Sequence, residues 1–204
     1  MKTKDGTQLK AQPDYHAMSD DDLLLAMAAG GNNGHSAFEA FSVRYIQPLN
    51  RLTYRLGFKS ADCEDMLQDI LVHIWQKATL WDKQKNISAR AWIYRVATNL
   101  CIDTHRKNTR QPAKGAVDID VVPLTGAVSS DQQSEQRERK AHIDAALLTL
   151  PERSRTALIL IYYQELSNKE AAQSMGVSVK AVEALLVRGR KMLKKSLKTS
   201  EGLL

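Results

Sequence analysis

Residues 166–190 read LSNKEAAQSMGVSVKAVEALLVRGR, a stretch with the signals of two helices joined by a sharp turn. Ser167 and Glu170 have the spacing of a capping box, which predicts the start of a short helix. Two adjacent alanines follow and allow a second helix to approach closely. Gly176 then permits the turn, because a residue without Cβ adopts positive φ at no steric cost. This pattern is typical of a helix-turn-helix.

The second helix of this motif begins after Ser178 and turns an apolar side inward with Val182. Residues 180–198 contain seven basic residues and one acidic residue. In helix-turn-helix proteins the second helix enters the major groove and basic side chains contact phosphates. We therefore expect duplex DNA to bind this side; a plain helical hairpin with a solvated basic face is the alternative. The displayed residues are Lys180, Glu183, Ala184, Val187, Arg188, Arg190 and Lys191.

The composition of the 204-residue chain narrows its class. Residues 136–204 hold 13 Lys/Arg and 7 Asp/Glu, so the whole net charge of +6 lies in the last third. Such asymmetry favours a polyanionic partner. Two cysteines exclude a disulfide scaffold, and no apolar run reaches the roughly 20 residues that span a bilayer. We expect a soluble, cytoplasmic protein without membrane insertion.

Helical periodicity and the absence of strand-like alternation predict an all-α fold of two small helical domains. The expected organisation is a disordered arm over 1–18, a first domain over 19–107, a flexible linker over 108–135 and a second domain over 136–204. Within the first domain, the Gly- and Asn-rich residues 30–34 predict a break between two helices.

The first domain contains an acidic helix next to a basic segment. Residues 62–78, DCEDMLQDILVHIWQKA, predict an amphipathic helix whose polar side holds acidic residues and no Lys or Arg before Lys77. Residues 82–110 hold seven Lys/Arg against two Asp, with Trp92 and Tyr94 interleaved. Basic residues mixed with aromatics suit single-stranded nucleic acid, although each aromatic could equally belong to the core.

These motifs resemble a known family in two separate places. Residues 64–75 resemble region 2.2 of bacterial RNA polymerase sigma factors, and residues 91–103 resemble regions 2.3–2.4 of their extracytoplasmic-function (ECF) group. Leu150 to Arg155 and the helix-turn-helix resemble region 4 of the same group. The resemblance covers residues 20–198, and the two motifs occur in the order that the family has.

The resemblance implies partners and contact residues. A sigma factor gives core RNA polymerase its promoter specificity, and the polymerase performs the catalysis, so no catalytic residue, metal or cofactor is expected. The acidic helix would contact the β′ clamp helices, and the β flap would be a second polymerase contact. The contacts on the clamp helices would come from Asp65, Gln68, Asp69 and His73.

The resemblance also implies how promoter DNA is read. The −10 element would bind the loop after the acidic helix and the helix that follows, with one base flipped into a pocket. Region 4 would place its second helix in the major groove of the −35 element. The residues that would contact the −10 element are Lys83, Asn86, Ser88, Arg90, Trp92, Arg95 and Asn99.

Other functions explain less of the chain. A stand-alone helix-turn-helix regulator would account for region 4 but not for the acidic helix or the basic–aromatic segment. The histidines and cysteines lack metal-ligand spacing, and no glycine-rich phosphate loop occurs, which argues against an enzyme. Cys63 and Cys101 are expected to be buried thiols, with a redox pair as the alternative. Family members are commonly held inactive by an anti-sigma factor, which makes such a protein an expected partner.

Overall fold

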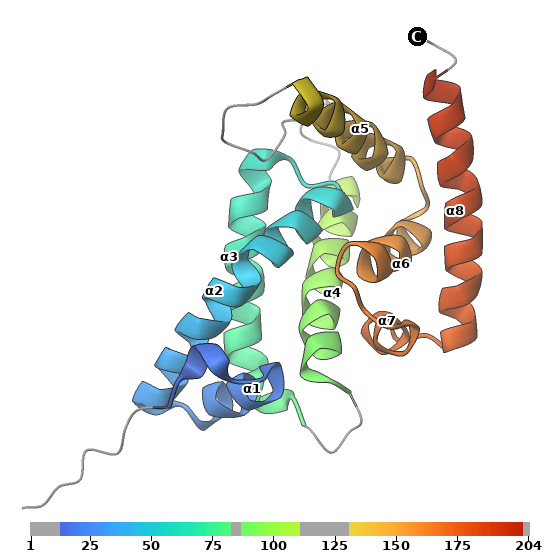
Figure 1. Ribbon diagram of the computed structural model, residues 1–204. Helices are drawn as coiled ribbons and strands as arrows, with labels where there is room; N and C mark the ends of the chain where they lie inside the picture. The colour runs from blue at the N-terminus through green and yellow to red at the C-terminus, as the bar shows by residue number, and fades with distance from the viewer. Residues whose placement is uncertain (1–12, 83–86, 111–130, 202–204) are drawn as a thin grey trace, which may run out of the picture.

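The computed structural model describes residues 13–82, 87–110 and 131–201, which form eight α-helices, two short 3-10 turns and no strand (Figure 1). The all-α prediction is confirmed. The elements are η1 (Tyr15–Ala17), α1 (Asp20–Ala29), α2 (Gly31–Leu56), α3 (Ser60–Lys77), η2 (Ala78–Leu80), α4 (Ala89–Arg110), α5 (Asp131–Leu148), α6 (Glu152–Tyr162), α7 (Asn168–Met175) and α8 (Val179–Glu201).

Helices α1 to α4 form the first domain around a buried apolar core. On α2 the buried residues recur every three or four positions, as one side of a helix requires. They face buried residues of α3 and α4, so α2 lies against both helices. The fully buried side chains that define this core include Phe41, Leu49, Ile70, Ile74 and Ile93.

The predicted break over residues 30–34 is too long, because α2 begins at Gly31. Only Gly30 separates α1 from α2, and it has a positive φ of 72°. Gly34 lies inside α2, where a Cβ would come within 3.3 Å of the Met27 carbonyl oxygen. This glycine therefore serves the close approach of two helices and not a loop.

The predicted disordered arm over 1–18 also extends too far toward α1, because its last residues are ordered. Residues 1–12 lie outside the described part of the chain, but Tyr15 is buried in the turn η1. The Arg44 guanidinium donates hydrogen bonds to the carbonyl oxygens of His16 and Met18, at 2.9 and 2.7 Å. These contacts between segments distant in sequence fix the chain before α1.

Helices α6, α7 and α8 form the second domain, and α5 contacts both α2 and α8. Helix α4 continues to Arg110 and α5 begins at Asp131, so both extend into the predicted linker over 108–135. The linker residues between these helices lie outside the described part. The two helical domains are thus present, as predicted.

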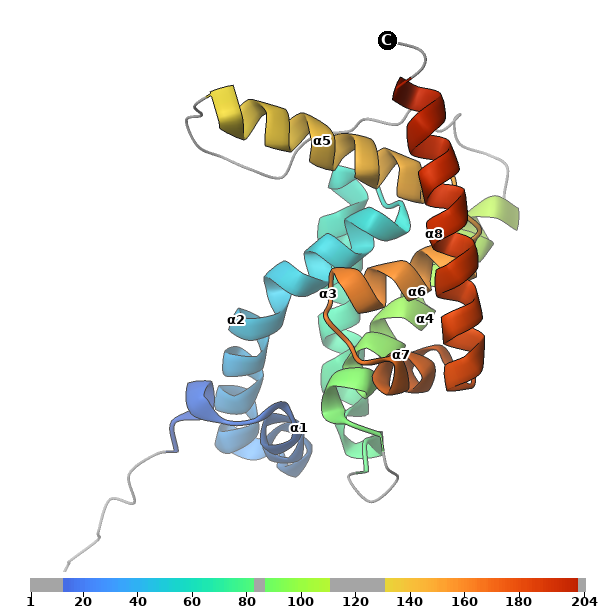
Figure 2. The same ribbon diagram turned by 45° about the vertical axis from the view of Figure 1, so that its right-hand side comes forward.

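The two domains are packed against each other. Helix α7 lies on α4, and α6 lies on α2, as both views of the ribbon show (Figures 1 and 2). The buried apolar cluster is continuous from the first domain into the second. The sequence predicted two tethered domains and gave no indication of this interface.

Candidate functional site

The polar side of α3 faces solvent. Asp65, Gln68 and Asp69, three of the four residues expected to contact the polymerase, are exposed. His73 is half-buried, and its Nδ1 lies 2.9 Å from the Asp69 carbonyl oxygen, a hydrogen bond that requires the proton on Nδ1. Val72 lies on the same helix and is 48% exposed. An exposed apolar side chain one turn after acidic ones suits a protein partner better than open solvent.

The segment that leads into α4 is held firmly at both of its described ends. The Trp81 indole N–H donates to the Ile87 carbonyl oxygen at 3.2 Å, which ties the ends of the segment together. Ser88 caps α4 by accepting from the Ala91 N–H, and a carboxylate of α1 accepts from the Ala89 N–H. Of the residues expected to contact the −10 element, Lys83 and Asn86 lie outside the described residues.

A pocket of about 370 Å³ between α3 and α4 brings together residues from two predicted sets. Trp92, Arg95 and Asn99, expected at the −10 element, line it beside His73, expected at the polymerase. The sequence interpretation missed three polar lining residues on the same side of α4, Asp103, Thr104 and Lys107, although helical spacing continued from Asn99 would have found them. It also missed Lys77, which lines the pocket from the end of α3.

The aromatic residues of this region have different roles. Trp92 is half-buried and lines the pocket, so one ring is accessible there. Trp81 and Tyr94 are 6% and 2% exposed and belong to the core, and burial raises the pKa of Tyr94 to about 12. Trp75 is stacked on His35. Trp81 and Tyr94 therefore belong to the core, while Trp75 and Trp92 are half-buried at its edge and only Trp92 of these two lines the pocket.

The helix-turn-helix has the local geometry that its sequence predicts. The capping box of Ser167 and Glu170 is complete, and Gly176 ends α7 with φ of 65°. The Ser178 hydroxyl accepts from the Ala181 N–H at 3.2 Å at the start of α8. Val182 is fully buried and anchors α8 against the rest of the domain.

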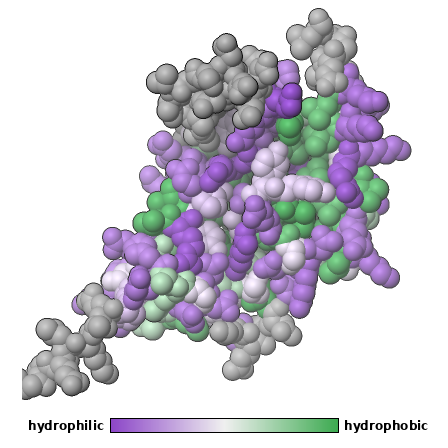
Figure 3. All heavy atoms as spheres, in the orientation of Figure 1, coloured by the Kyte–Doolittle hydropathy of each residue, from purple (hydrophilic) through white to green (hydrophobic). Residues whose placement is uncertain are grey.

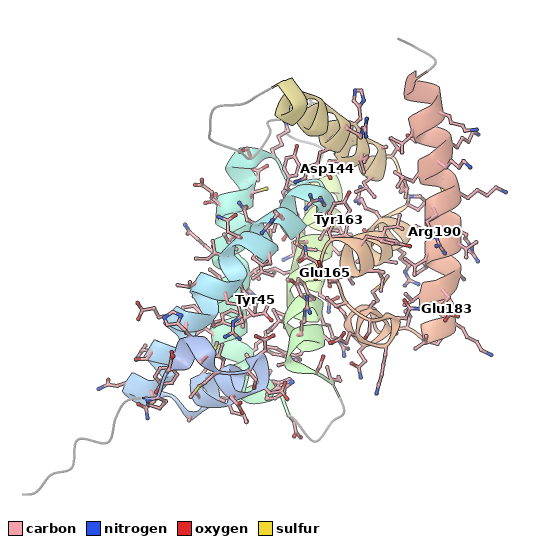
Figure 4. All side chains as sticks on the ribbon, viewed as in Figure 1. Tyr45, Asp144, Tyr163, Glu165, Glu183 and Arg190 are labelled. Carbon is pink, nitrogen blue, oxygen red and sulfur yellow. The ribbon has the colours of Figure 1, made fainter. Side chains whose placement is uncertain are left out.

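All seven residues expected at the −35 element are exposed on α8. Hydrophilic side chains cover the outer edge of this helix (Figure 3). Glu183 lies near the end of α8 that follows α7, and Arg190 lies two turns further along (Figure 4). The Arg190 guanidinium donates to the Tyr162 hydroxyl at 3.4 Å, so this cation leans toward α6.

Two predicted DNA-contacting residues already have protein partners. The Ser88 hydroxyl donates to Glu170 Oε1 at 3.2 Å, and Arg90 donates to the Gln164 carbonyl oxygen. Burial raises the pKa of the Glu170 carboxyl, but hydrogen bonds from Ser167 and Ser88 and the charge of Arg90 outweigh burial and hold this pKa below its usual range. Glu170 is therefore an anion that faces the start of α4.

Neither cysteine forms a disulfide: Cys63 and Cys101 are both free and buried. Burial raises the pKa of the Cys101 thiol to about 12, which disfavours the reactive thiolate. In the part of the chain that the structure describes, no group of three or more His, Cys, Asp or Glu could hold a metal ion. Among these same residues, no helix is both long enough and apolar enough to cross a membrane.

Each of the two domains matches a known protein-family model. Residues 42–111 match sigma-70 region 2, and residues 141–193 match sigma-70 region 4. The RNA polymerase sigma factor CnrH of Cupriavidus metallidurans is 30% identical over 179 residues, which are 85% of this chain and 92% of that protein. The RNA polymerase sigma factor NccH of Alcaligenes xylosoxydans xylosoxydans is 31% identical, with 89% of this chain and 96% of that protein covered.

A solved structure of CnrH in complex with the cytosolic domain of CnrY is similar in fold. Its TM-score is 0.64 at 25% identity, and the match covers 88% of this chain and 97% of that one. The chain therefore belongs to the sigma-70 family of RNA polymerase sigma factors. Similarity to ECF sigma factors, such as SigM of Mycobacterium tuberculosis at 27% identity over 87% of this chain and 84% of that protein, places it in the ECF group.

Proposed function

We propose that this chain binds core RNA polymerase through α3 and directs it to promoters by contacting the −35 and −10 elements. The observation that carries this proposal is the placement of two family-specific surfaces on one chain. The acidic residues of α3 are exposed, and the basic side of α8 is exposed on the other domain. A stand-alone helix-turn-helix regulator would not explain the exposed acidic surface of α3.

The contact with the polymerase would be made by the exposed side of α3, with the β′ clamp helices as the partner. Asp65 and Asp69 supply charge for a basic surface, Gln68 supplies a hydrogen-bonding amide, and the apolar Val72 adds buried area. The half-buried His73 lies at the edge of this surface beside the pocket. The second domain would contact the β flap.

The −35 element would be read in the major groove by α8. Lys180, Arg188, Arg190 and Lys191 can neutralise phosphates, which gives affinity that falls with salt. Glu183 is exposed among these cations and can accept a hydrogen bond from cytosine N4. A carboxylate at this position predicts a −35 sequence with a cytosine at the contacted base pair.

The −10 element would be read by the segment that leads into α4 and by the pocket between α3 and α4. Trp92 offers a stacking surface worth about 1–3 kcal/mol per base, which helps to offset the few kcal/mol needed to unstack a flipped base. Arg95 is exposed and supplies positive charge for the backbone, and Asn99 supplies an amide. Lys83, Asn86, Ser88 and Arg90 would complete this surface from the preceding segment.

An anti-sigma factor is the further partner that we propose, with the CnrH–CnrY complex as the support from a relative. The chain would work in the cytoplasm, where the polymerase is found.

The test is the association of the purified chain with core polymerase, measured by co-elution, together with its own preference for duplex DNA. We expect a stable complex with core polymerase and little sequence selectivity in the isolated chain. Tight, selective binding of duplex DNA by a dimer that ignores core polymerase would instead support the stand-alone regulator.

A further inference from the structure

Helix α1 lies against both described ends of the segment that leads into α4. It packs on η2, which precedes this segment, and on α4, which follows it. Leu23 and Leu24 of α1 are fully buried in the core of the first domain. Beside them, Asp21 Oδ1 accepts a hydrogen bond from the Ala89 N–H at 3.1 Å. Ala89 is the first residue of α4, so α1 holds the start of that helix directly.

The bond from Ala89 fills a position that the local sequence leaves open. The first N–H groups of a helix have no partner within the helix. The Ser88 hydroxyl accepts from the Ala91 N–H at 3.1 Å, and a capping side chain reaches only the second or third donor of its helix. Ala89 itself is fully buried. Without Asp21, its N–H would lose this partner in a buried position, which costs stability at the start of α4.

The part of α1 that holds Asp21 is itself fixed to α2. The preceding residue, Asp20, accepts hydrogen bonds from Arg44 Nη1 at 2.7 Å and from the Tyr45 hydroxyl at 2.6 Å. Burial raises the pKa of Tyr45 above its ordinary value, so this hydroxyl stays protonated and remains a donor. Two adjacent carboxylates of α1 therefore connect α2 with the start of α4.

We propose that Asp21 is a positioning residue for recognition of the −10 element. Its carboxylate fixes the first turn of α4, and thereby fixes how Arg90 and Trp92 are presented to promoter DNA. The inference rests on the proposed function, which assigns these two residues to the −10 element. Asp21 acts through α4, because its carboxylate is used on the Ala89 N–H. A first turn that is already ordered lowers the entropy cost of binding DNA.

The start of α4 has a second conceivable use, and it predicts the opposite effect of removing Asp21. Unpaired N–H groups at the start of a helix attract anions, and a DNA phosphate is such an anion. If the Ala89 N–H were kept for a phosphate, removal of Asp21 would strengthen DNA binding. If Asp21 positions α4, the same change weakens recognition of the −10 element. The sign of the effect therefore separates the two.

The test uses the full chain bound to core polymerase, on a promoter located by mapping transcript 5′ ends. The variants are Asp21→Ala, which removes the acceptor, and Asp21→Asn, which keeps an oxygen that can accept from the Ala89 N–H. The matched control is Asp22→Ala, an exposed carboxylate in the same turn of α1. This control keeps the cap of α1, because Ser19 accepts from the backbone N–H of residue 22.

Two measurements are made on each variant. Initiation is measured on the promoter and on its single-base variants in the −35 and −10 elements. Hydrogen exchange, followed by mass spectrometry, measures the protection of residues 87–92.

We expect Asp21→Ala to lower initiation about fivefold, which corresponds to the loss of one helix cap. Residues 87–92 should exchange faster, and the −10 variants should be discriminated less well. Binding of core polymerase and discrimination at the −35 element should stay unchanged. Asp21→Asn should remain within about twofold of the wild type, because the hydrogen bond is retained. The Asp22→Ala control should match the wild type in both measurements.

Several results would overturn the positioning role. They are unchanged or increased initiation in Asp21→Ala, an equal loss in Asp21→Asn, an equal loss in the control, and an equal loss of discrimination at both promoter elements. Failure of the wild type to bind core polymerase would instead count against the proposed function.

A further variant keeps the test decisive if Asp21→Ala does not fold, which thermal unfolding would reveal. Asp21→Glu keeps the charge and moves the carboxylate by one methylene, whereas Asp21→Asn keeps the oxygen in place and removes the charge. We expect the glutamate variant to lose discrimination at the −10 element and the asparagine variant to retain it. The reverse result would show that charge and not position matters, and would contradict the proposal.

Discussion

His105 shows how one buried side chain makes stability depend on pH. Its ring packs 4.3 Å from the Phe58 ring at the end of the first domain. Burial lowers the pKa of His105, and the nearby charge of Arg155 lowers it further. Because this pKa is lower in the folded chain than in the unfolded chain, the unfolded chain binds the proton first as the pH falls.

We therefore predict that the free energy of unfolding decreases as the pH drops below about 6.5, the ordinary pKa of histidine. Above that pH the His105 contribution is fully present. Urea unfolding at about pH 7.5 and pH 5.5 measures the effect, and His105→Phe should reduce the difference. The control is His35→Phe, an exposed histidine stacked on Trp75, and an equal reduction in the control would contradict the prediction.

Gly189 illustrates a residue whose small size the packing requires. A Cβ at this position would lie 2.9 Å from Leu158 Cδ1 and 3.2 Å from its Cγ. Leu158 is 3% exposed, so its side chain has little room to move. We predict that Gly189→Ala costs about 1 kcal/mol of stability, because overpacking exceeds the gain in helix propensity.

Thermal unfolding of the full chain checks this prediction, because the effect of Gly189→Ala on the melting temperature should reverse when Leu158 is shortened. In a Leu158→Ala background the added methyl has space, and Gly189→Ala should then stabilise α8. If Gly189→Ala raises the melting temperature in both backgrounds, the close contact between α6 and α8 is not what requires glycine.

Among the elements, α3 carries the claim that this chain contacts the polymerase. Asp69 is exposed in the middle of the acidic side. Asp69→Lys reverses a charge at this surface, so we predict at least tenfold weaker binding of core polymerase, a loss of about 1.4 kcal/mol or more. Surface plasmon resonance with immobilised core polymerase measures it, and Glu39→Lys on α2 is the matched charge reversal. Equal losses in both variants would remove the specific role of α3.

Helix α8 carries the −35 interaction. Arg188 is exposed in its first half, where a recognition helix meets the major groove. We predict that Arg188→Ala lowers initiation at −35-dependent promoters about tenfold, since a base or phosphate contact is worth roughly 1–3 kcal/mol. Lys198→Ala, at the far end of α8, is the control. Full activity of Arg188→Ala on every −35 variant would exclude this residue as a reader.

The helices differ in how well their bounds could be predicted from the sequence. The α7–α8 turn could be predicted because its signals are local: a capping box, the left-handed Gly176 and the cap Ser178. The start of α2 could not be predicted, because Gly34 looks like a helix breaker in the sequence. A glycine is needed there because the helix passes close to Met27 on α1, and that contact is not visible in the sequence. Tyr15 was missed for the same reason, since its order depends on distant contacts.

At the scale of the whole molecule, two domains were predictable and their arrangement was not. The residues of the candidate site were predicted from the resemblance to sigma regions 2 and 4, and their roles remain predictions. The structure adds that Trp92, Arg95 and Asn99 share a pocket with His73. The interface through Arg55, Asp144 and Gln164 joins residues that are far apart in the chain. No local pattern encodes such pairs, so the packing of one domain on the other could not be predicted from the sequence.

The most direct test of the central claim is transcription by core polymerase with and without this chain, with the 5′ ends of the transcripts mapped on genomic DNA. The account predicts discrete start sites that appear only when the chain is added, each preceded by the same pair of −35 and −10 sequences. Transcripts that begin at the same scattered positions with and without the chain would contradict it.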